Sequence, residues 1–163
     1  MAHTRAPNGK TWLRKPKRRP NEPYIAVLFG LSAETTSGFE LDVIRDAIIG
    51  GKIRGTQFKA LRKAMSLSVE QITAVIGSSQ RTIARKEGGQ ASLSPTEADR
   101  AYRLARIGDL ATESIGDRVK AMRWLATPNA YLGNQTPLAM LDTELGTTYV
   151  EQSLAAIAYG GVA

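Results

Sequence analysis

The sequence predicts an all-α fold, because three observations agree. From Phe39 onward, apolar residues recur at the three- and four-residue spacing of amphipathic helices. No segment sustains the two-residue alternation of a half-buried strand. Ser, Thr, Asp, Pro and Gly stand where helices begin and end. We therefore expect a helical bundle with three parts: an extended basic arm (residues 1–36), a helix-turn-helix domain (37–107) and a C-terminal helical domain (108–163).

Composition narrows the class of protein. A chain of 163 residues, 42% hydrophobic, has room for one core of moderate size. It contains no apolar run of membrane-spanning length, and no apolar stretch typical of a secretory signal follows its basic start. The absence of cysteine excludes disulfides and thiolate metal sites and suits a reducing compartment. We expect a cytoplasmic protein without membrane contact.

The net charge of +7 belongs to the arm. Residues 1–20 hold seven basic residues and no acid, which leaves 15 basic and 15 acidic residues in the rest of the chain. Two interpretations stay open for this segment, a solvated arm or one that binds nucleic acid or another polyanion. Four of the seven prolines lie within residues 1–36, which predicts an extended conformation. The apolar run at residues 24–31 is expected to lie on the body of the protein.

Two helices are predicted before the central motif. The first spans residues 41–49 and ends at Gly50–Gly51, and the second spans about residues 57–65. The residues predicted to face the core are Leu41, Ile44, Ile48 and Ile49 in the first helix and Phe58, Leu61 and Met65 in the second.

Residues 69–88 have the outline of a helix-turn-helix. Ser68 and Gln71 form a capping-box pattern at the start of the first helix, Gly77 supplies the positive φ of a tight turn, and Ser79 can cap the second helix. In such a motif the second helix enters the major groove, where Gln pairs with adenine and Arg with guanine. Ser79 and the helix start suit a phosphate. The candidate DNA-binding residues are Ser79, Gln80, Arg81, Thr82 and Arg85.

Three positions depart from the usual motif. Ser78 follows the turn glycine where an apolar residue is usual, Thr73 replaces a small alanine, and Lys86 stands where a late core residue is expected. The alternative interpretation is therefore a helical corner of a bundle with a solvated basic face.

The later helices are marked by strong local signals. Ser94 and Glu97 form a second capping box with Pro95 at the first helical position, and Asp117 begins another helix. Inward-facing residues are predicted at Leu104 and Ile107 in the first and at Val119, Met122 and Leu125 in the second. A row of arginines at positions 100, 103 and 106 is expected to form a solvated face, with a contact to another protein as the alternative.

The C-terminal third contains no catalytic pattern. Pro128 ends the preceding helix, Thr136–Pro137 begins a short one, and a last helix over residues 146–160 ends at Gly160–Gly161. Its apolar stripe is predicted to be Val150, Leu154, Ile157 and Ala158. This segment looks like a docking surface with a tail. Trp124 is either a core residue or a partner-facing anchor.

No constellation of polar residues suggests an enzyme. The single histidine, His3, lies in the arm without a plausible partner, and Glu70, Glu97 and Asp117 are explained as helix-start residues. The glycine pairs follow helices and do not form a phosphate-binding loop. We expect no catalytic residue, no metal and no cofactor.

Residues 40–160 resemble the Xre/ParS/MbcA-type antitoxins, the partners of RES-domain toxins, and the ParS branch looks nearest. The arm lies outside the resemblance. The matching elements are Arg81-Thr82, Leu93-Ser94-Pro95, Asp99-Arg100, Leu104-Ala105-Arg106, Trp124-Leu125-x-x-Pro128-Asn129, Thr136-Pro137-Leu138, Gly146, Val150, Leu154, Ile157 and Gly160.

The resemblance implies a non-enzymatic inhibitor. We expect a dimer, because helix-turn-helix proteins usually read two half-sites, and operator DNA is a candidate second partner. The partner toxins resemble ADP-ribosyltransferases and consume NAD, either by degrading it or by modifying a protein. The antitoxin would lay its C-terminal domain and tail over the NAD pocket, with a frayed tail as the alternative. The implied toxin-binding residues are Trp124, Asn129, Tyr159, Gly160, Gly161, Val162 and Ala163. The rival interpretation is a stand-alone helix-turn-helix transcription regulator with a dimerising C-terminal domain.

Overall fold

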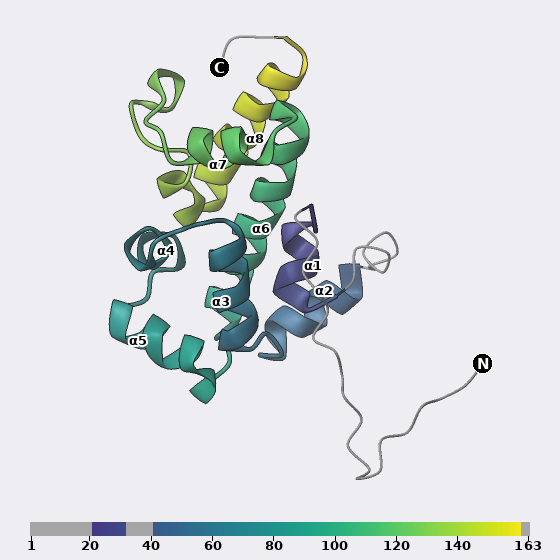
Figure 1. Cartoon of the computed structure of the whole chain (residues 1–163), viewed down its shortest axis with the longest axis vertical. Coiled ribbons are helices and arrows are strands. Elements are labelled where there is room, and N and C mark those ends of the chain that lie inside the picture. The colour runs from purple at the N-terminus through teal and green to yellow at the C-terminus, as the bar shows by residue number, and fades with distance from the viewer. Residues whose placement is uncertain (1–20, 32–40, 161–163) are drawn as a thin grey trace, which may run out of the picture.

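The computed structural model describes residues 21–31 and 41–160 of the chain. These residues form eight α-helices and short 3₁₀ and π turns, without a β-strand, so the all-α prediction is confirmed. The long helix α6 runs through the middle of the molecule, with α2 to α5 around its first half, α1 along its middle, and α7 and α8 beside its second half (Figure 1). No helix in the described part of the chain is long and apolar enough to cross a bilayer.

Helix α6 (Pro95–Ile115) has the capping box that the sequence predicts. The hydroxyl oxygen of Ser94 accepts a hydrogen bond from the Glu97 amide, and the Ser94 amide donates to Glu97 Oε2 at 2.7 Å. The helix ends at Gly116, whose φ is 77°. Leu104 and Ile107 are fully buried, as predicted. The expected domain boundary at residue 107 therefore lies inside one continuous helix.

The apolar run that follows the arm is a helix and part of the core. Helix α1 (Tyr24–Phe29) packs against α3 and α6, and the Tyr24 side chain is completely buried. Both carboxylate oxygens of Asp109, on α6, accept hydrogen bonds from the first amides of α1, at 2.7 Å from Tyr24 and 3.0 Å from Ile25. The Arg118 guanidinium lies 3.7 Å above the Tyr24 ring. An extended conformation is thus wrong for residues 24–29.

Helix α2 (Leu41–Ile49) buries less than the sequence predicts. Ile44 is buried and Ile48 half-buried, but Leu41 is 79% exposed and Ile49 is also exposed. The helix packs against α6, and only the narrow stripe that faces α6 is covered. The prediction that all four apolar residues face the core is therefore wrong for Leu41 and Ile49.

The next three helices follow the predicted order. They are α3 (Gly55–Ala64), α4 (Val69–Ile76) and α5 (Gln80–Arg85), and the π turn η2 (Lys86–Gln90) follows. The predicted core residues of this region, Phe58, Leu61 and Met65, are buried. The α3 helix starts two residues earlier than predicted. The first residue of the helix, Gly55, lies so close to the turn after α5 that an added Cβ would come within 1.9 Å of the Lys86 carbonyl oxygen. Only glycine fits at this position.

The second half of α6 carries the C-terminal elements. These are α7 (Arg118–Leu125), the 3₁₀ turns η3 (Ala130–Leu132) and η4 (Ala139–Asp142), and α8 (Glu144–Ala158). Asp117 caps α7 as predicted, and Leu125 is buried. Val119 is 79% exposed, which contradicts the predicted inward position. Helix α7 buries Ala121 and Leu125, one turn apart, and Val119 lies on another side of the helix.

The last helix begins earlier than predicted, with Thr143 as its cap. Val150 and Leu154 are buried and Ile157 is half-buried, whereas Ala158 is exposed. Thr136 does accept a hydrogen bond from the Ala139 amide, at 3.2 Å, but the element that follows is the 3₁₀ turn η4. Pro137 and Leu138 are buried beside it.

The arginine row on α6 is not a solvated face. Arg100 donates to the Ile76 carbonyl oxygen at the end of α4, at 2.8 Å. Arg103 pairs with Asp99 at 2.6 Å and reaches Glu144 of α8 at 3.4 Å, and Arg106 pairs with Glu151 of α8. These contacts join α6 to both of its neighbouring units, so the predicted solvated face is corrected.

Candidate functional site

The α4–α5 unit has the geometry of a helix-turn-helix. Ser68 and Gln71 form the predicted capping box, and Gly77 ends α4 with a φ of 72°. The Ser79 hydroxyl accepts a hydrogen bond from the Thr82 amide at 3.2 Å and thereby caps α5. The turn is therefore built from local signals that the sequence displays.

A buried polar cluster lies beneath this turn. Glu97 Oε1 accepts a hydrogen bond from the Ser78 hydroxyl at 2.6 Å, and Glu97 Oε2 lies 2.5 Å from Lys86 Nζ. Burial alone would raise the pKa of Glu97, but the hydrogen bonds from Lys86, Ser78 and Ser94 lower it to about 2. Two of the departures from the usual motif, Ser78 and Lys86, are thus partners of the same carboxylate.

Thr73, the third departure from the usual motif, and Glu87, at the end of the motif, also have hydrogen-bond partners within the protein. The Thr73 hydroxyl donates to the Val69 carbonyl oxygen at 2.6 Å. Arg62, on α3, makes a two-bond contact with Glu87 at 2.6 and 2.7 Å and donates to the Leu67 carbonyl oxygen. Hydrogen bonding to Glu87 raises the pKa of Arg62. The turn after α5 is therefore fixed to α3.

The structure places the predicted DNA-binding residues together on α5. Gln80, Arg81 and Arg85 are exposed, whereas Thr82 is half-buried and Ser79 uses its hydroxyl as the helix cap. The surrounding segment, residues 41–94, carries nine basic and four acidic residues. A basic, exposed helix that follows a tight turn is the arrangement that reads the major groove.

The structure describes four of the seven predicted toxin-binding residues. Trp124 is half-buried and packs on the core. Asn129 stabilises the next turn. Its side-chain oxygen accepts a hydrogen bond from the backbone amide of Tyr131 at 2.9 Å, and its backbone amide donates one to the Gln135 carbonyl oxygen at 3.0 Å. Tyr159 is 91% exposed at the end of α8, and Gly160 is exposed beside it. Gly161, Val162 and Ala163 lie outside the described residues.

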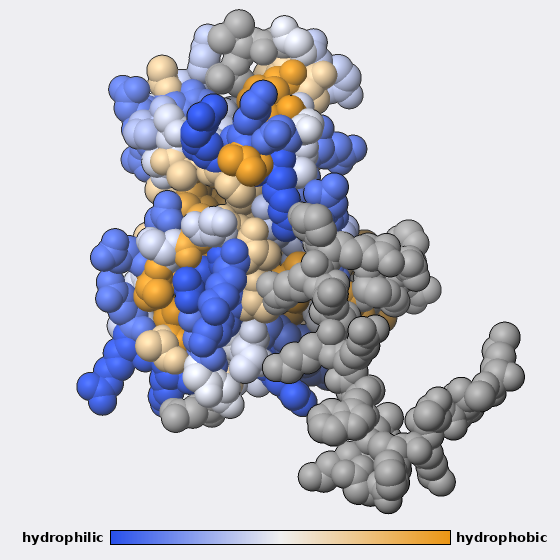
Figure 2. Space-filling view, in the orientation of Figure 1, coloured by the Kyte–Doolittle hydropathy of each residue, from blue (hydrophilic) through white to orange (hydrophobic). Residues whose placement is uncertain are grey.

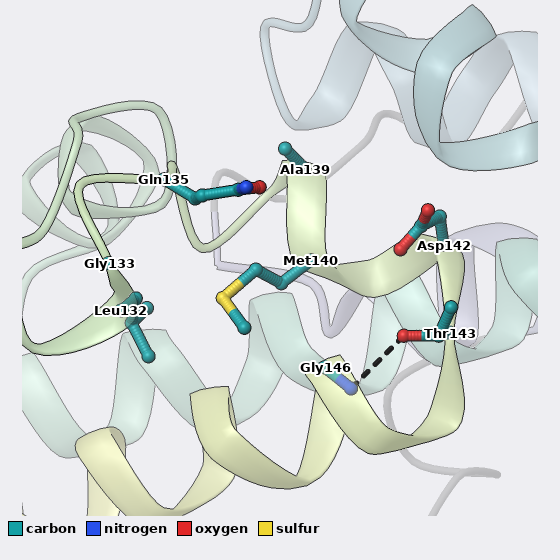
Figure 3. A pocket seen from close by; sticks show the side chains of 8 residues that line it. All are labelled: Leu132, Gly133, Gln135, Ala139, Met140, Asp142, Thr143 and Gly146. Atoms are coloured by element: carbon teal, nitrogen blue, oxygen red, sulfur yellow. Dashed lines mark hydrogen bonds between the residues drawn. The ribbon is translucent and has the colours of Figure 1, made fainter.

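Sequence reasoning missed a groove in the C-terminal domain. This groove, about 290 Å³ in volume, lies between the η3 turn, η4 and the start of α8. Leu132 and Met140 give it apolar walls, and Gln135 and Asp142 stand at its polar edge (Figure 3). All its walls come from one continuous segment, residues 132–146, but no spacing pattern marks it, because its shape depends on how two 3₁₀ turns fold against the start of α8.

Large apolar side chains are exposed on the same domain. Tyr131, Leu145 and Tyr149 are exposed next to the segments that line the groove. Apolar residues break the hydrophilic surface in the part of the molecule that holds α7 and α8 (Figure 2). The sequence indicates part of this exposed surface, because Leu145 and Tyr149 are one helical turn apart and so lie on the same side of α8. Exposed apolar surface of this kind is found at protein-binding surfaces.

The described residues include no group of three or more His, Asp or Glu side chains placed to hold a metal ion. The described carboxylates with shifted pKa values serve the fold instead: Glu97 holds the cluster beneath the turn, and Asp109 caps α1. Burial raises the pKa of Asp109, against the effect of the two amides that it accepts from.

Comparison with known families gives matches to two consecutive parts of the chain. Residues 54–106 match the antitoxin Xre-like helix-turn-helix domain, and residues 110–160 match the antitoxin Xre/MbcA/ParS C-terminal toxin-binding domain. The first match ends and the second begins within α6. The fold and these matches define the class: a helix-turn-helix protein that carries the toxin-binding domain of antitoxins.

Curated relatives agree with this class. The chain is 39% identical over 80 residues to the antitoxin Xre of Pseudomonas putida, a match that covers 49% of this chain and 50% of the relative. It is 29% identical over 96 residues to the antitoxin Xre of Yersinia enterocolitica, which covers 58% of this chain and 65% of the relative. The chain thus spans about half to two thirds of the length of these relatives. Residues 54–106 and 110–160 thus match two domains of the Xre/MbcA/ParS antitoxins.

Proposed function

We propose that this protein is the antitoxin of a type II toxin–antitoxin pair, and that its C-terminal domain binds and inhibits a toxin of the RES type. The observation that carries the proposal is the match of residues 110–160 to a toxin-binding domain. The exposed Tyr131 and Tyr149 on this domain support a protein partner, since tyrosine is enriched at protein interfaces and at their hot spots.

Inhibition is proposed to occur at the toxin's NAD pocket. Tyr159, 91% exposed at the end of α8, begins the tail that would cover the pocket. Gly160 and Gly161 add little bulk, which favours a close approach of the backbone. Trp124 and Asn129 then act indirectly, since both are engaged in the fold of the domain.

The helix-turn-helix is proposed to bind the operator of the pair and repress its transcription. Gln80, Arg81 and Arg85 are the base-reading candidates, because they are exposed on α5. Ser79 and Thr82 are expected to fix the helix start and to approach the phosphates. Proteins of this kind usually read two half-sites as dimers, so we expect a dimer on DNA.

Co-expression tests the proposal. The gene adjacent to this one is expressed in a heterologous host with and without this chain, while growth and cellular NAD are followed. We expect growth arrest and NAD loss without the antitoxin, and recovery of both with it. Arrest with unchanged NAD, relieved by this chain, would favour transfer of ADP-ribose to a protein. A harmless neighbour would overturn the antitoxin proposal and favour a stand-alone transcription regulator.

A further inference from the structure

We propose that the groove of the C-terminal domain binds one basic side chain of the toxin, with the aliphatic stem between Leu132 and Met140 and the charged head at Asp142. This inference rests on the proposed function, because the occupant belongs to the toxin. It goes further by assigning a binding pocket and the chemistry of the group that fills it.

The lining of the groove suits a side chain that is apolar along its length and charged at its end. Leu132 and Met140 both line the groove with apolar atoms, and the flexible thioether of Met140 adapts to the shape of a guest. Asp142 lies at the opposite end of the groove from Leu132, and the Gln135 amide extends across the space (Figure 3). Arg and Lys place an aliphatic stem on apolar surface while the charged head meets a polar group. Arg is also among the residues enriched at interface hot spots.

The charge of this region favours a basic partner. No Lys or Arg follows Arg123 in the sequence, and the acids beyond it are Asp142, Glu144 and Glu151. Glu144 and Glu151 are already paired with arginines of α6. Asp142 is exposed and makes no ion pair or side-chain hydrogen bond within the described residues. It is the acid of this region that remains free for a cation of the partner.

The groove is held open by the packing of its own walls. A Cβ on Gly146 would come within 2.1 Å of the Met140 carbonyl oxygen, so η4 and α8 already touch backbone to backbone. The Thr143 hydroxyl accepts a hydrogen bond from the Gly146 amide at 3.1 Å and fixes the corner between them (Figure 3). The fully buried Leu141 anchors η4 from below. A pocket that is already formed loses little conformational entropy on binding.

The test compares dissociation constants of full-length variants for the purified toxin encoded by the adjacent gene, measured by isothermal titration calorimetry. Ala139→Phe fills the groove from its exposed rim, and Asp142→Asn removes the charge while keeping the shape. We expect about 30-fold weaker binding for Ala139→Phe and about tenfold weaker binding for Asp142→Asn. The affinity of wild type should also fall more steeply with added salt than that of Asp142→Asn.

Matched controls carry the same chemical changes elsewhere. Ala84→Phe adds an exposed ring on α5, and Glu113→Gln removes an exposed charge near the end of α6, so both should bind as wild type does. If wild type itself does not bind, the proposed function fails and this inference with it. If wild type binds and both groove variants bind equally well, the groove is not the pocket although the antitoxin function stands. If only Ala139→Phe weakens binding, the occupant is apolar and not basic.

Discussion

Lys86 and Glu97 form a buried ion pair, 2.5 Å between Nζ and Oε2, that connects the end of the recognition helix α5 to the first turn of α6. The two residues are only 8% and 7% exposed. Lys86 also donates to the Ser92 carbonyl oxygen at 3.1 Å, and Glu97 holds Ser78 and Ser94. The position of α5, the proposed DNA-reading helix, therefore depends on a polar contact and not on apolar packing alone.

Removing one partner of this pair should destabilise the protein strongly. Lys86→Met leaves the buried carboxylate of Glu97 without its cation, and we expect a loss of about 3 kcal/mol in the free energy of unfolding. Urea denaturation of the variant and of wild type measures this difference in the free energy of unfolding. In the double variant Lys86→Met, Glu97→Gln the cost should be smaller than the sum of the single costs. Additive effects would show that the pair is not coupled.

The same carboxylate predicts a dependence of stability on acid. The pKa of Glu97 falls from its usual 4.5 to about 2 in the folded protein, so its contribution is complete above pH 4.5 and is lost as the pH falls toward 2. Thermal melts of wild type between pH 6 and pH 2.5 should show this loss. The variant Glu97→Gln should have a flatter profile below pH 4.5. Parallel profiles would contradict the assignment.

Gly77 should tolerate alanine poorly. Its φ of 72° costs an alanine about 1 kcal/mol, and the new Cβ would lie 2.1 Å from Arg100 Nη1, which would have to release the Ile76 carbonyl oxygen. Gly116→Ala is the control, because its φ is 77° but nothing lies within 4 Å of the added Cβ. We expect Gly77→Ala to lower the unfolding free energy by about 1 kcal/mol more than the control. This excess should vanish in an Arg100→Ala background.

Arg81→Ala and Arg85→Ala should separate the two proposed activities. Each removes an exposed base-reading side chain, so operator affinity should fall roughly tenfold or more, as measured by fluorescence anisotropy. Toxin neutralisation should remain intact, and Lys120→Ala, an exposed change on α7, should affect neither activity. Loss of both activities in Arg81→Ala would indicate unfolding, and unchanged DNA binding would remove α5 as the reading element.

Deleting residues 160–163 should weaken neutralisation without unfolding the protein. Tyr159 is 91% exposed and Gly160 is also exposed, so we expect the melting temperature to stay within a few degrees of wild type. Growth rescue in the co-expression assay measures the loss. Full protection by the truncated protein would exclude a role of the tail at the NAD pocket.

Helix ends were predictable because their signals are local. Ser68, Ser79, Ser94 and Asp117 cap the helices expected of them, and the contacts lie within three residues along the chain. The faces of the short helices were less predictable. Whether Leu41 or Val119 is buried depends on how many neighbours the helix has, which is decided by the tertiary fold.

The candidate sites show the same contrast between local signals, which the sequence displays, and contacts made only by the tertiary fold. The candidate reading residues on α5 could be identified because a helix-turn-helix is one continuous segment. The arginine row was misread, because the carbonyl oxygen of Ile76 and the carboxylates of Glu144 and Glu151 are distant from it in sequence. The groove lies within residues 132–146, but its shape depends on how two successive 3₁₀ turns fold against α8, and no spacing rule encodes that arrangement.

The continuity of α6 through both family matches has a geometric consequence. With no hinge between residues 95 and 115, the angle between the reading helix and the groove is set once, when the chain folds. A toxin bound at the groove would therefore keep a fixed orientation relative to the promoter DNA. Steric overlap between two bound toxins would then decide whether a second toxin–antitoxin complex fits on the neighbouring half-site. The ratio of toxin to antitoxin would in that case control repression without any conformational change in the antitoxin.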